Sequence, residues 1–237
     1  MSKTTITEQF TVVVPAAGIG KRMNSEYPKQ YLKINQKCII EHTIERLLSH
    51  PNINKVVVAL SAHDEVFSTL DVAKSTNVST VIGGSERYDS VLAGLHSLAS
   101  DDWVLVHDAA RPCITHQDIN ELLLHCINTH SGAILATPVR DTMKRSDSNN
   151  LILCTESRES LWHAQTPQMY KCQQLQQAIE QAIVSNVTIT DESSAIEYAG
   201  LASAIVSGRE DNIKITRPSD LNLAAFILNQ QKEETCV

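Results

Sequence analysis

Apolar residues in this chain gather in two kinds of segment. Short continuous runs, such as VVV at 12–14 and VVVAL at 56–60, are typical of strands that are covered on both faces. Between these runs, apolar residues recur at helical spacing. The pattern predicts strands at 10–14, 55–60, 78–82, 103–107 and 133–138, and helices at 39–48, 89–98 and 115–130. Because strands alternate with helices, we expect an α/β, Rossmann-like fold with a mostly parallel sheet flanked by helices.

The segment at 139–165 breaks this rhythm. Its central SDSNN is a turn signal between two short segments of β character, which predicts a β-hairpin arm that projects from the body. Beyond the arm, the pattern predicts helices at 173–184, 191–198 and 218 to about 231, and a strand at 204–206. We expect one domain over 1–237, with the arm as part of it.

Composition narrows the classes of function. The chain has 237 residues, of which 42% are hydrophobic and 20% are charged, so general disorder is excluded. A net charge of −7 argues against nucleic acid as a partner. No apolar run is long enough to predict a membrane span, and the first residues lack the apolar segment of a secretory signal. The six scattered cysteines are expected to be free thiols, which favours a cytoplasmic protein.

A loop of small residues, PAAGIGKRM at 15–23, follows the first predicted strand. Small residues allow close approach of the backbone to a ligand, and successive N–H groups in such a loop can bind an anion. Arg22 adds a cation that suits bidentate contact with phosphate. The loop departs from the dinucleotide-binding pattern G-x-G-x-x-G at Met23, so a dinucleotide loop or a simple tight turn are the alternatives. The candidate anion-binding residues are Pro15, Ala16, Ala17, Gly18 and Gly20.

A second basic residue follows in the segment Tyr27-Pro28-Lys29-Gln30. If this segment passes over the first loop, Arg22 and Lys29 together can clamp a polyphosphate, with Lys29 acting as a point charge. The alternative for Lys29 is an ordinary solvated surface charge.

These two loops, with six further segments, resemble the nucleotidyltransferases and most closely the 2-C-methyl-D-erythritol 4-phosphate cytidylyltransferase family. The resemblance extends from about Val12 to Leu228. The further segments are GGSERYDS at 83–90, VHDAARP at 106–112, DTMK at 141–144, LWHAQTPQ at 161–168, TDE at 190–192 and NIKITRP at 212–218.

The resemblance implies a reaction in which CTP and methylerythritol phosphate give a CDP-alcohol and pyrophosphate, a step of isoprenoid precursor synthesis. Both substrates are anions, so we expect catalysis by positioning and charge compensation, with no protein nucleophile. The resemblance assigns Arg22 and Lys29 as the catalytic residues. Mg²⁺ is the expected cofactor, held mainly by phosphates, with Asp108 as a possible ligand.

The resemblance also assigns the binding residues. The nucleotide is expected to contact the first loop together with Gly83, Gly84, Ser90 and Asp108, although Asp108 can instead be a turn residue and Ser90 an ordinary helix residue. His107 is expected to be buried and structural. The residues expected to bind the polyol phosphate are Arg111, Thr142, Arg158, Thr166, Thr190 and Lys214.

Thr142 and Arg158 lie on the predicted arm. In the family the arm reaches into a second subunit, so we expect a homodimer in which these residues complete the neighbour's site. A lone two-stranded hairpin is marginal in water and needs a partner. Two alternative functions stay open at this point, a ribitol 5-phosphate cytidylyltransferase and a nucleotide sensor without catalysis.

Overall fold

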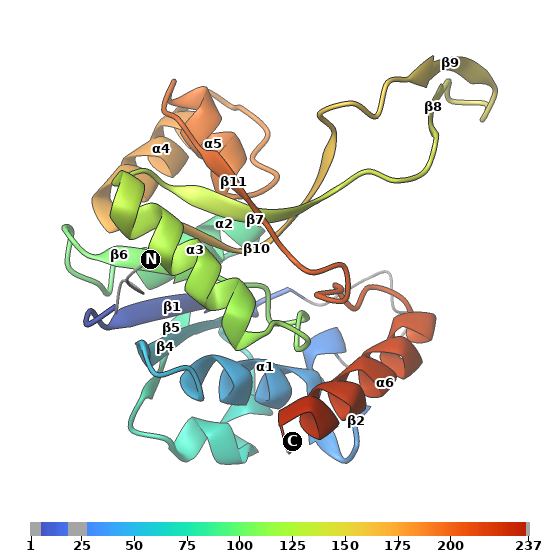
Figure 1. The fold of residues 1–237 in the computed structure, drawn as a ribbon. Coiled ribbons are helices and arrows are strands. Elements are labelled where there is room, and N and C mark those ends of the chain that lie inside the picture. Colours follow the sequence, from blue (N-terminus) through green and yellow to red (C-terminus); the bar gives the residue numbers. More distant parts are fainter. Residues whose placement is uncertain (1–5, 19–27, 236–237) are drawn as a thin grey trace, which may run out of the picture.

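The computed structural model describes residues 6–18 and 28–235. Its centre is a seven-stranded sheet with the strand order β11-β7-β10-β6-β1-β4-β5 (Figure 1). All neighbouring strands are parallel except β10, which runs antiparallel to β6 and β7. The strands are β1 (Phe10–Pro15), β4 (Ile53–Leu60), β5 (Val78–Ile82), β6 (Trp103–Val106), β7 (Ala133–Pro138), β10 (Trp162–Lys171) and β11 (Ala204–Ser207). The α/β, Rossmann-like prediction is confirmed.

Helices cover both faces of the sheet, because consecutive strand residues point to opposite sides. Val12 and Val14 of β1 face a core cluster with helices α1 and α3, whereas Val13 faces a second cluster with α2, α4 and α5. All three valines are fully buried, which explains the continuous apolar run. The helices are α1 (Ile39–Leu48), α2 (Arg87–Leu95), α3 (His116–Thr129), α4 (Cys172–Val184) and α5 (Glu192–Tyr198).

The last helix, α6 (Pro218–Thr235), closes one end of the molecule over a third cluster. It packs beside a small ribbon formed by β2 (Lys33–Ile34) and β3 (Lys37–Cys38), and Ile215 lies in the same cluster (Figure 1). The Ile215 N–H also donates to the Ala110 carbonyl, and this hydrogen bond holds the segment just before α6 against the loop that follows β6.

The sheet reverses its strand order next to β1. From β1 the chain moves outward to β4 and β5, and it then returns to the opposite side of β1 as β6. The segments that leave the carboxyl ends of β1 and β6 therefore run to opposite sides, which makes this a topological switch point, the place where open α/β sheets bind their ligands.

The predicted arm exists, but its boundary at 165 is wrong. The hairpin of β8 (Met143–Ser146) and β9 (Ile152–Glu156) projects from the body (Figure 1), whereas β10 begins at Trp162 and returns the chain to the centre of the sheet. The sequence pattern did not predict this strand, and a proline such as Pro167 is unusual inside a central strand. β10 accommodates the proline at an irregularity, where its pairing with β7 skips from Ala164 to Gln168.

The other corrections are shifts at element ends. The helix predicted at 89–98 spans Arg87–Leu95, because Glu86 caps it and the Asp89 side chain accepts from the Glu86 N–H. The strand predicted at 103–107 ends at Val106, one residue before His107. The strand predicted at 55–60 begins earlier, at Ile53, and α6 extends beyond 231.

Candidate active site

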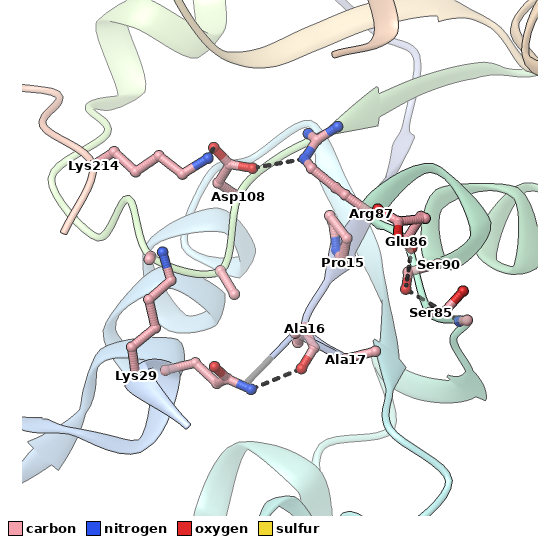
Figure 2. A pocket seen from close by; sticks show the side chains of 15 residues that line it. Pro15, Ala16, Ala17, Lys29, Ser85, Glu86, Arg87, Ser90, Asp108 and Lys214 are labelled. Carbon is pink, nitrogen blue, oxygen red and sulfur yellow. Dashed lines mark hydrogen bonds and ion pairs between the residues drawn. The ribbon is translucent and has the colours of Figure 1, made fainter. Parts of the chain in front are cut away.

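A pocket of about 260 Å³ opens at the switch point (Figure 2). Residues that follow β1, β5 and β6 line it, together with residues from the start of α2 and from the segment before α6. Most of the residues predicted to bind the nucleotide lie here, namely Pro15, Ala16, Ala17, Gly18, Gly84, Ser90 and Asp108, and Lys29 lines the same pocket. Gly20 and Arg22 lie outside the described residues.

Lys29 enters the pocket from the short 3₁₀ turn η2 (Lys29–Tyr31). Its ammonium Nζ lies 3.2 Å from the Ile215 carbonyl oxygen. The next residue, Gln30, is buried and donates from Nε2 to the Ala16 carbonyl at 2.7 Å. This bond ties the segment that carries Lys29 to the loop after β1, so the two predicted phosphate-binding loops meet as the sequence suggested.

The loop after β5 closes the pocket on the other side. A Cβ on Gly83 would lie 2.6 Å from Ser90 Oγ and 2.9 Å from the Cβ of Ala17, so only glycine permits this approach. The Gly84 N–H donates to Ser90 Oγ at 3.3 Å, and Ser90 is buried at the second turn of α2. Gly83 thus holds the loop in place rather than lining the pocket.

Asp108 stands at the end of this pocket and is surrounded by three cations. Its Oδ2 lies 2.7 Å from Lys214 Nζ and 3.5 Å from Arg111 Nε, and its Oδ1 lies 3.2 Å from Arg87 Nε. Figure 2 shows Arg87 and Lys214 approaching it from opposite sides. Burial alone would raise the pKa of Asp108, but attraction to these cations outweighs burial and holds the pKa well below its usual range. Asp108 is therefore ionised and holds Arg87, Arg111 and Lys214 around its carboxylate, which is more than a turn residue would do.

Arg87 is itself held from behind. Its Nη1 and Nη2 donate to the two carboxylate oxygens of Glu192 at 2.6 and 3.0 Å, and Glu192 is almost fully buried. Burial opposes the charge on Arg87, but attraction to Glu192 and Asp108 is larger and raises its pKa. The guanidinium therefore stays charged and fixed in direction.

A second pocket of about 250 Å³ is also lined by Asp108. It contains four of the residues predicted to bind the polyol phosphate, namely Arg111, Thr166, Thr190 and Lys214. Arg87, Asp108 and Lys214 line both pockets. Arg111 is buried, and its Nη1 donates to the Asn212 carbonyl at 2.6 Å, so its charge is anchored close to Asp108.

The other two predicted substrate residues, Thr142 and Arg158, line neither of these pockets. Both are exposed on the segment that leads to and from the hairpin. Arg158 donates from Nη1 to the Arg140 carbonyl within the same arm. Within one described chain, the structure does not bring them to the site.

A bound divalent cation would find few protein ligands here. Over residues 6–18 and 28–235 there is no group of three or more His, Cys, Asp or Glu side chains that could hold a metal ion. Both oxygens of Asp108 already contact cations. The residues present therefore fit a metal carried by the phosphates of a nucleotide, and they do not fit a metal held in a protein cage.

Sequence reasoning missed two of the residues that organise the site, Gln30 and Glu192. For Arg87 it left two alternatives open, contact with the nucleotide or support of the loop. Glu192 is separated from Arg87 by 105 positions, so no local pattern indicated the pair. Residue type alone could have indicated the pair, because an acidic residue at the start of a helix, such as Glu192, is a candidate partner for a buried arginine.

The comparisons with known proteins agree with this geometry. The family model of 2-C-methyl-D-erythritol 4-phosphate cytidylyltransferase (IspD) matches residues 10–230. The chain belongs to this family. It is 54% identical to the 2-C-methyl-D-erythritol 4-phosphate cytidylyltransferase of Colwellia psychrerythraea, over 97% of this chain and 98% of the relative. The enzyme of the same name from Tolumonas auensis is also 54% identical, over 96% of this chain and its whole length.

A solved structure supports the same assignment at the level of the fold. The Francisella tularensis 2-C-methyl-D-erythritol 4-phosphate cytidylyltransferase superposes with a TM-score of 0.80 at 32% identity, over 93% of this chain and 100% of that one. Members of this family are nucleotidyltransferases, a class of enzyme that generally uses a divalent cation. No helix in the described part of the chain is long and apolar enough to cross a membrane.

Proposed function

We propose that this chain transfers the cytidylyl group of CTP to 2-C-methyl-D-erythritol 4-phosphate and releases pyrophosphate. The observation that carries the proposal is the pair of pockets that share Arg87, Asp108 and Lys214. One pocket has the small-residue loop and Lys29 for a nucleotide, and the other has Arg111, Thr166 and Thr190 for a phosphorylated alcohol. A reaction between two bound anions needs such a shared cationic boundary.

In the reaction, an oxygen of the phosphate monoester attacks the α-phosphorus of CTP. A new P–O bond forms there as the bond to the pyrophosphate leaving group breaks. Negative charge grows on the leaving group, and Lys29 and Arg22 are proposed to stabilise it. Lys214, Arg111 and Arg87 compensate the charge of the attacking phosphate, and Asp108 holds these three cations in position through its ion pairs with them.

We further propose that the divalent cation of this enzyme is Mg²⁺ and that the triphosphate of CTP would hold it in the nucleotide pocket. When bound, it would neutralise phosphate charge in the transition state. The described residues offer few side-chain ligands, so phosphate oxygens and water would supply most of the coordination of Mg²⁺, as is usual for this ion. We also propose a cytoplasmic location, which the scattered free cysteines support.

The test is pyrophosphate release from CTP, Mg²⁺ and the phosphorylated alcohol. Lys29→Ala and Arg22→Ala are expected to lower kcat by about 10²–10³, the typical effect of removing one preorganised donor. Lys33→Ala is the control, since Lys33 is exposed on β2 and lines neither pocket. Binding of CTP without turnover would identify a nucleotide sensor, and a preference for ribitol 5-phosphate would overturn the substrate assignment.

We propose that the active form is a homodimer in which the arm of one subunit brings Thr142 and Arg158 to the second pocket of the other. The exposed apolar residues on the hairpin support this, because Leu151, Ile152 and Leu153 lack cover within one chain. Mixing Lys29→Ala and Arg158→Ala subunits tests it. A shared site predicts that the mixed dimer recovers activity in one of its two sites, whereas confirmed heterodimers without recovery would show that Arg158 acts within its own chain.

A further inference from the structure

His107 forms a buried chain of hydrogen bonds at the end of β6 that the mechanism above does not use. Its imidazole is fully buried. Nε2 lies 3.0 Å from the Arg111 carbonyl oxygen, and Nδ1 lies 3.1 Å from Thr166 Oγ1. The Asp108 N–H donates to the same Thr166 oxygen at 3.0 Å. The ring thus joins Arg111 to Thr166, and both of these residues line the second pocket.

Donor and acceptor accounting gives each of these bonds a direction. A carbonyl oxygen only accepts, so Nε2 of His107 carries a proton and donates to the Arg111 carbonyl. A neutral imidazole then has a bare Nδ1, which only accepts. Because Nδ1 accepts, the hydroxyl proton of Thr166 points to it.

The surroundings of the ring keep it neutral. Burial lowers the pKa of His107 to about 4, although the hydrogen bond to the Arg111 carbonyl opposes this effect. The charges that face the ring also oppose one another, since Asp108 raises its pKa and Arg111 lowers it. At neutral pH the ring therefore has one proton.

Thr166 is left with a single free function. A threonine hydroxyl has one proton and two lone pairs. The proton is used on His107, and one lone pair accepts from the Asp108 N–H. The remaining lone pair is not used by these two contacts, and Thr166 lines the second pocket, so a bound group can donate a hydrogen bond to it there. Phosphate oxygens near neutral pH mostly accept, whereas an alcohol hydroxyl donates.

We propose that His107 is a positioning residue that turns the Thr166 hydroxyl into an acceptor for a hydroxyl group of the polyol phosphate. This rests on the function proposed above. In this arrangement Thr166 selects the alcohol part of the substrate, while Lys214 and Arg111 supply the charge for its phosphate. The sequence alone indicated only that His107 is structural.

The kinetic test uses two replacements that each keep one half of the imidazole. In His107→Asn, the side-chain amide lies where Nδ1 was, so it keeps an acceptor for the Thr166 hydroxyl. In His107→Gln, the amide lies where Nε2 was, so it keeps only the donor to the Arg111 carbonyl. We expect His107→Gln to raise the KM for the polyol phosphate by about tenfold, the size of one hydrogen bond, with the KM for CTP unchanged. His107→Asn is expected to stay near the wild type.

The Thr166→Val background separates this role from a general structural one. If His107 acts through Thr166, His107→Gln produces no further rise in that KM once the hydroxyl is absent. An alkyl phosphate without hydroxyl groups, used as a competitive inhibitor, is expected to bind the wild type and His107→Gln equally. Additive effects in the double variant, or equal losses for the alkyl phosphate, would overturn the proposal. Turnover by the wild type tests the proposed function separately.

A spectroscopic measurement does not depend on the folding of any variant. In protein with ¹⁵N-labelled histidine, long-range ¹H–¹⁵N spectra at neutral pH are expected to show a protonated Nε2 and a bare Nδ1 for His107. The signals are assigned by their absence in His107→Asn, or by proximity to Thr166 if that variant does not fold. A ring protonated at Nδ1 would overturn the proposal, because Thr166 would then be free to donate.

Discussion

Charged side chains are buried or half-buried at the boundary between the two pockets, which is formed by Arg87, Asp108 and Lys214, but they are exposed on the hairpin arm. At the boundary, the buried Asp108 contacts Arg87, Arg111 and Lys214. These residues come from three parts of the chain, because Arg111 follows Asp108 by only three positions. On the arm, the ion pair of Arg145 and Glu156 joins two neighbouring strands, and both side chains are exposed.

This difference shows which part of the site a single chain can build. A buried charge without a partner is costly, so folding brings the three cations and Asp108 together in one arrangement. An exposed ion pair adds little, and an isolated two-stranded hairpin is marginal. The boundary is therefore organised within one subunit, whereas we expect the arm to gain its stability from a partner.

The largest expected effect comes from Asp108→Asn. It leaves three cations close together without their carboxylate, so we expect a loss of about 3–5 kcal/mol in the free energy of unfolding, together with a strong loss of turnover. Urea denaturation and pyrophosphate release measure the two effects. Asp71→Asn is the matched control, since Asp71 pairs with Lys74 at the surface, and we expect no measurable change. Equal effects of the two substitutions would remove the contrast between boundary and surface.

The double substitution Ile152→Ser with Leu153→Ser tests the arm. These side chains are 65% and 63% exposed in one chain, so their replacement is expected to weaken self-association and to lower activity while the thermal midpoint of the monomer stays constant. Analytical ultracentrifugation and the turnover assay measure this. Val184→Ser is the control, because Val184 is 84% exposed at the end of α4 and far along the chain from the arm. Unchanged association in the double variant would contradict a role of the arm as an interface.

The pH dependence of stability is expected to come from the body and not from the arm. Burial lowers the pKa of His107 and of His50 to about 4, so the unfolded chain binds protons on them before the folded chain does. The free energy of unfolding is therefore expected to fall as the pH drops from about 6.5 towards 4. Denaturant titrations at several pH values measure the slope. His107→Asn should reduce it, whereas a variant of the arm that does so would contradict this assignment.

The smallest expected effect is that of Arg145→Ala. It breaks the ion pair with Glu156 on the exposed hairpin, and we expect no measurable shift of the thermal midpoint, because solvent screens both charges. Differential scanning calorimetry on dilute protein is the measurement. A shift comparable with that of Asp108→Asn would mean that the arm is a stable unit within one chain.

The sequence alone was enough to predict most of the sheet and its covering helices. The runs at β1 and β4 are apolar at every position because both faces of these strands are buried, and that property is local. The small-residue loop and Lys29 could likewise be selected from the sequence as candidates for binding phosphate, and the structure brings Lys29 into the pocket beside Pro15–Gly18.

Only the tertiary structure decided the central antiparallel strand and the partners of the buried charges. β10 contains polar residues and a proline. Its residues 165–170 are buried, and other segments satisfy their polar groups, as Asp191 does for Gln168 and Asn212 does for the Thr166 carbonyl. In the same way, Glu192 is acceptable inside the protein because Arg87 meets it across 105 positions. Periodicity records which face of an element is apolar, but the partner of a buried polar group depends on which distant segments the fold places together.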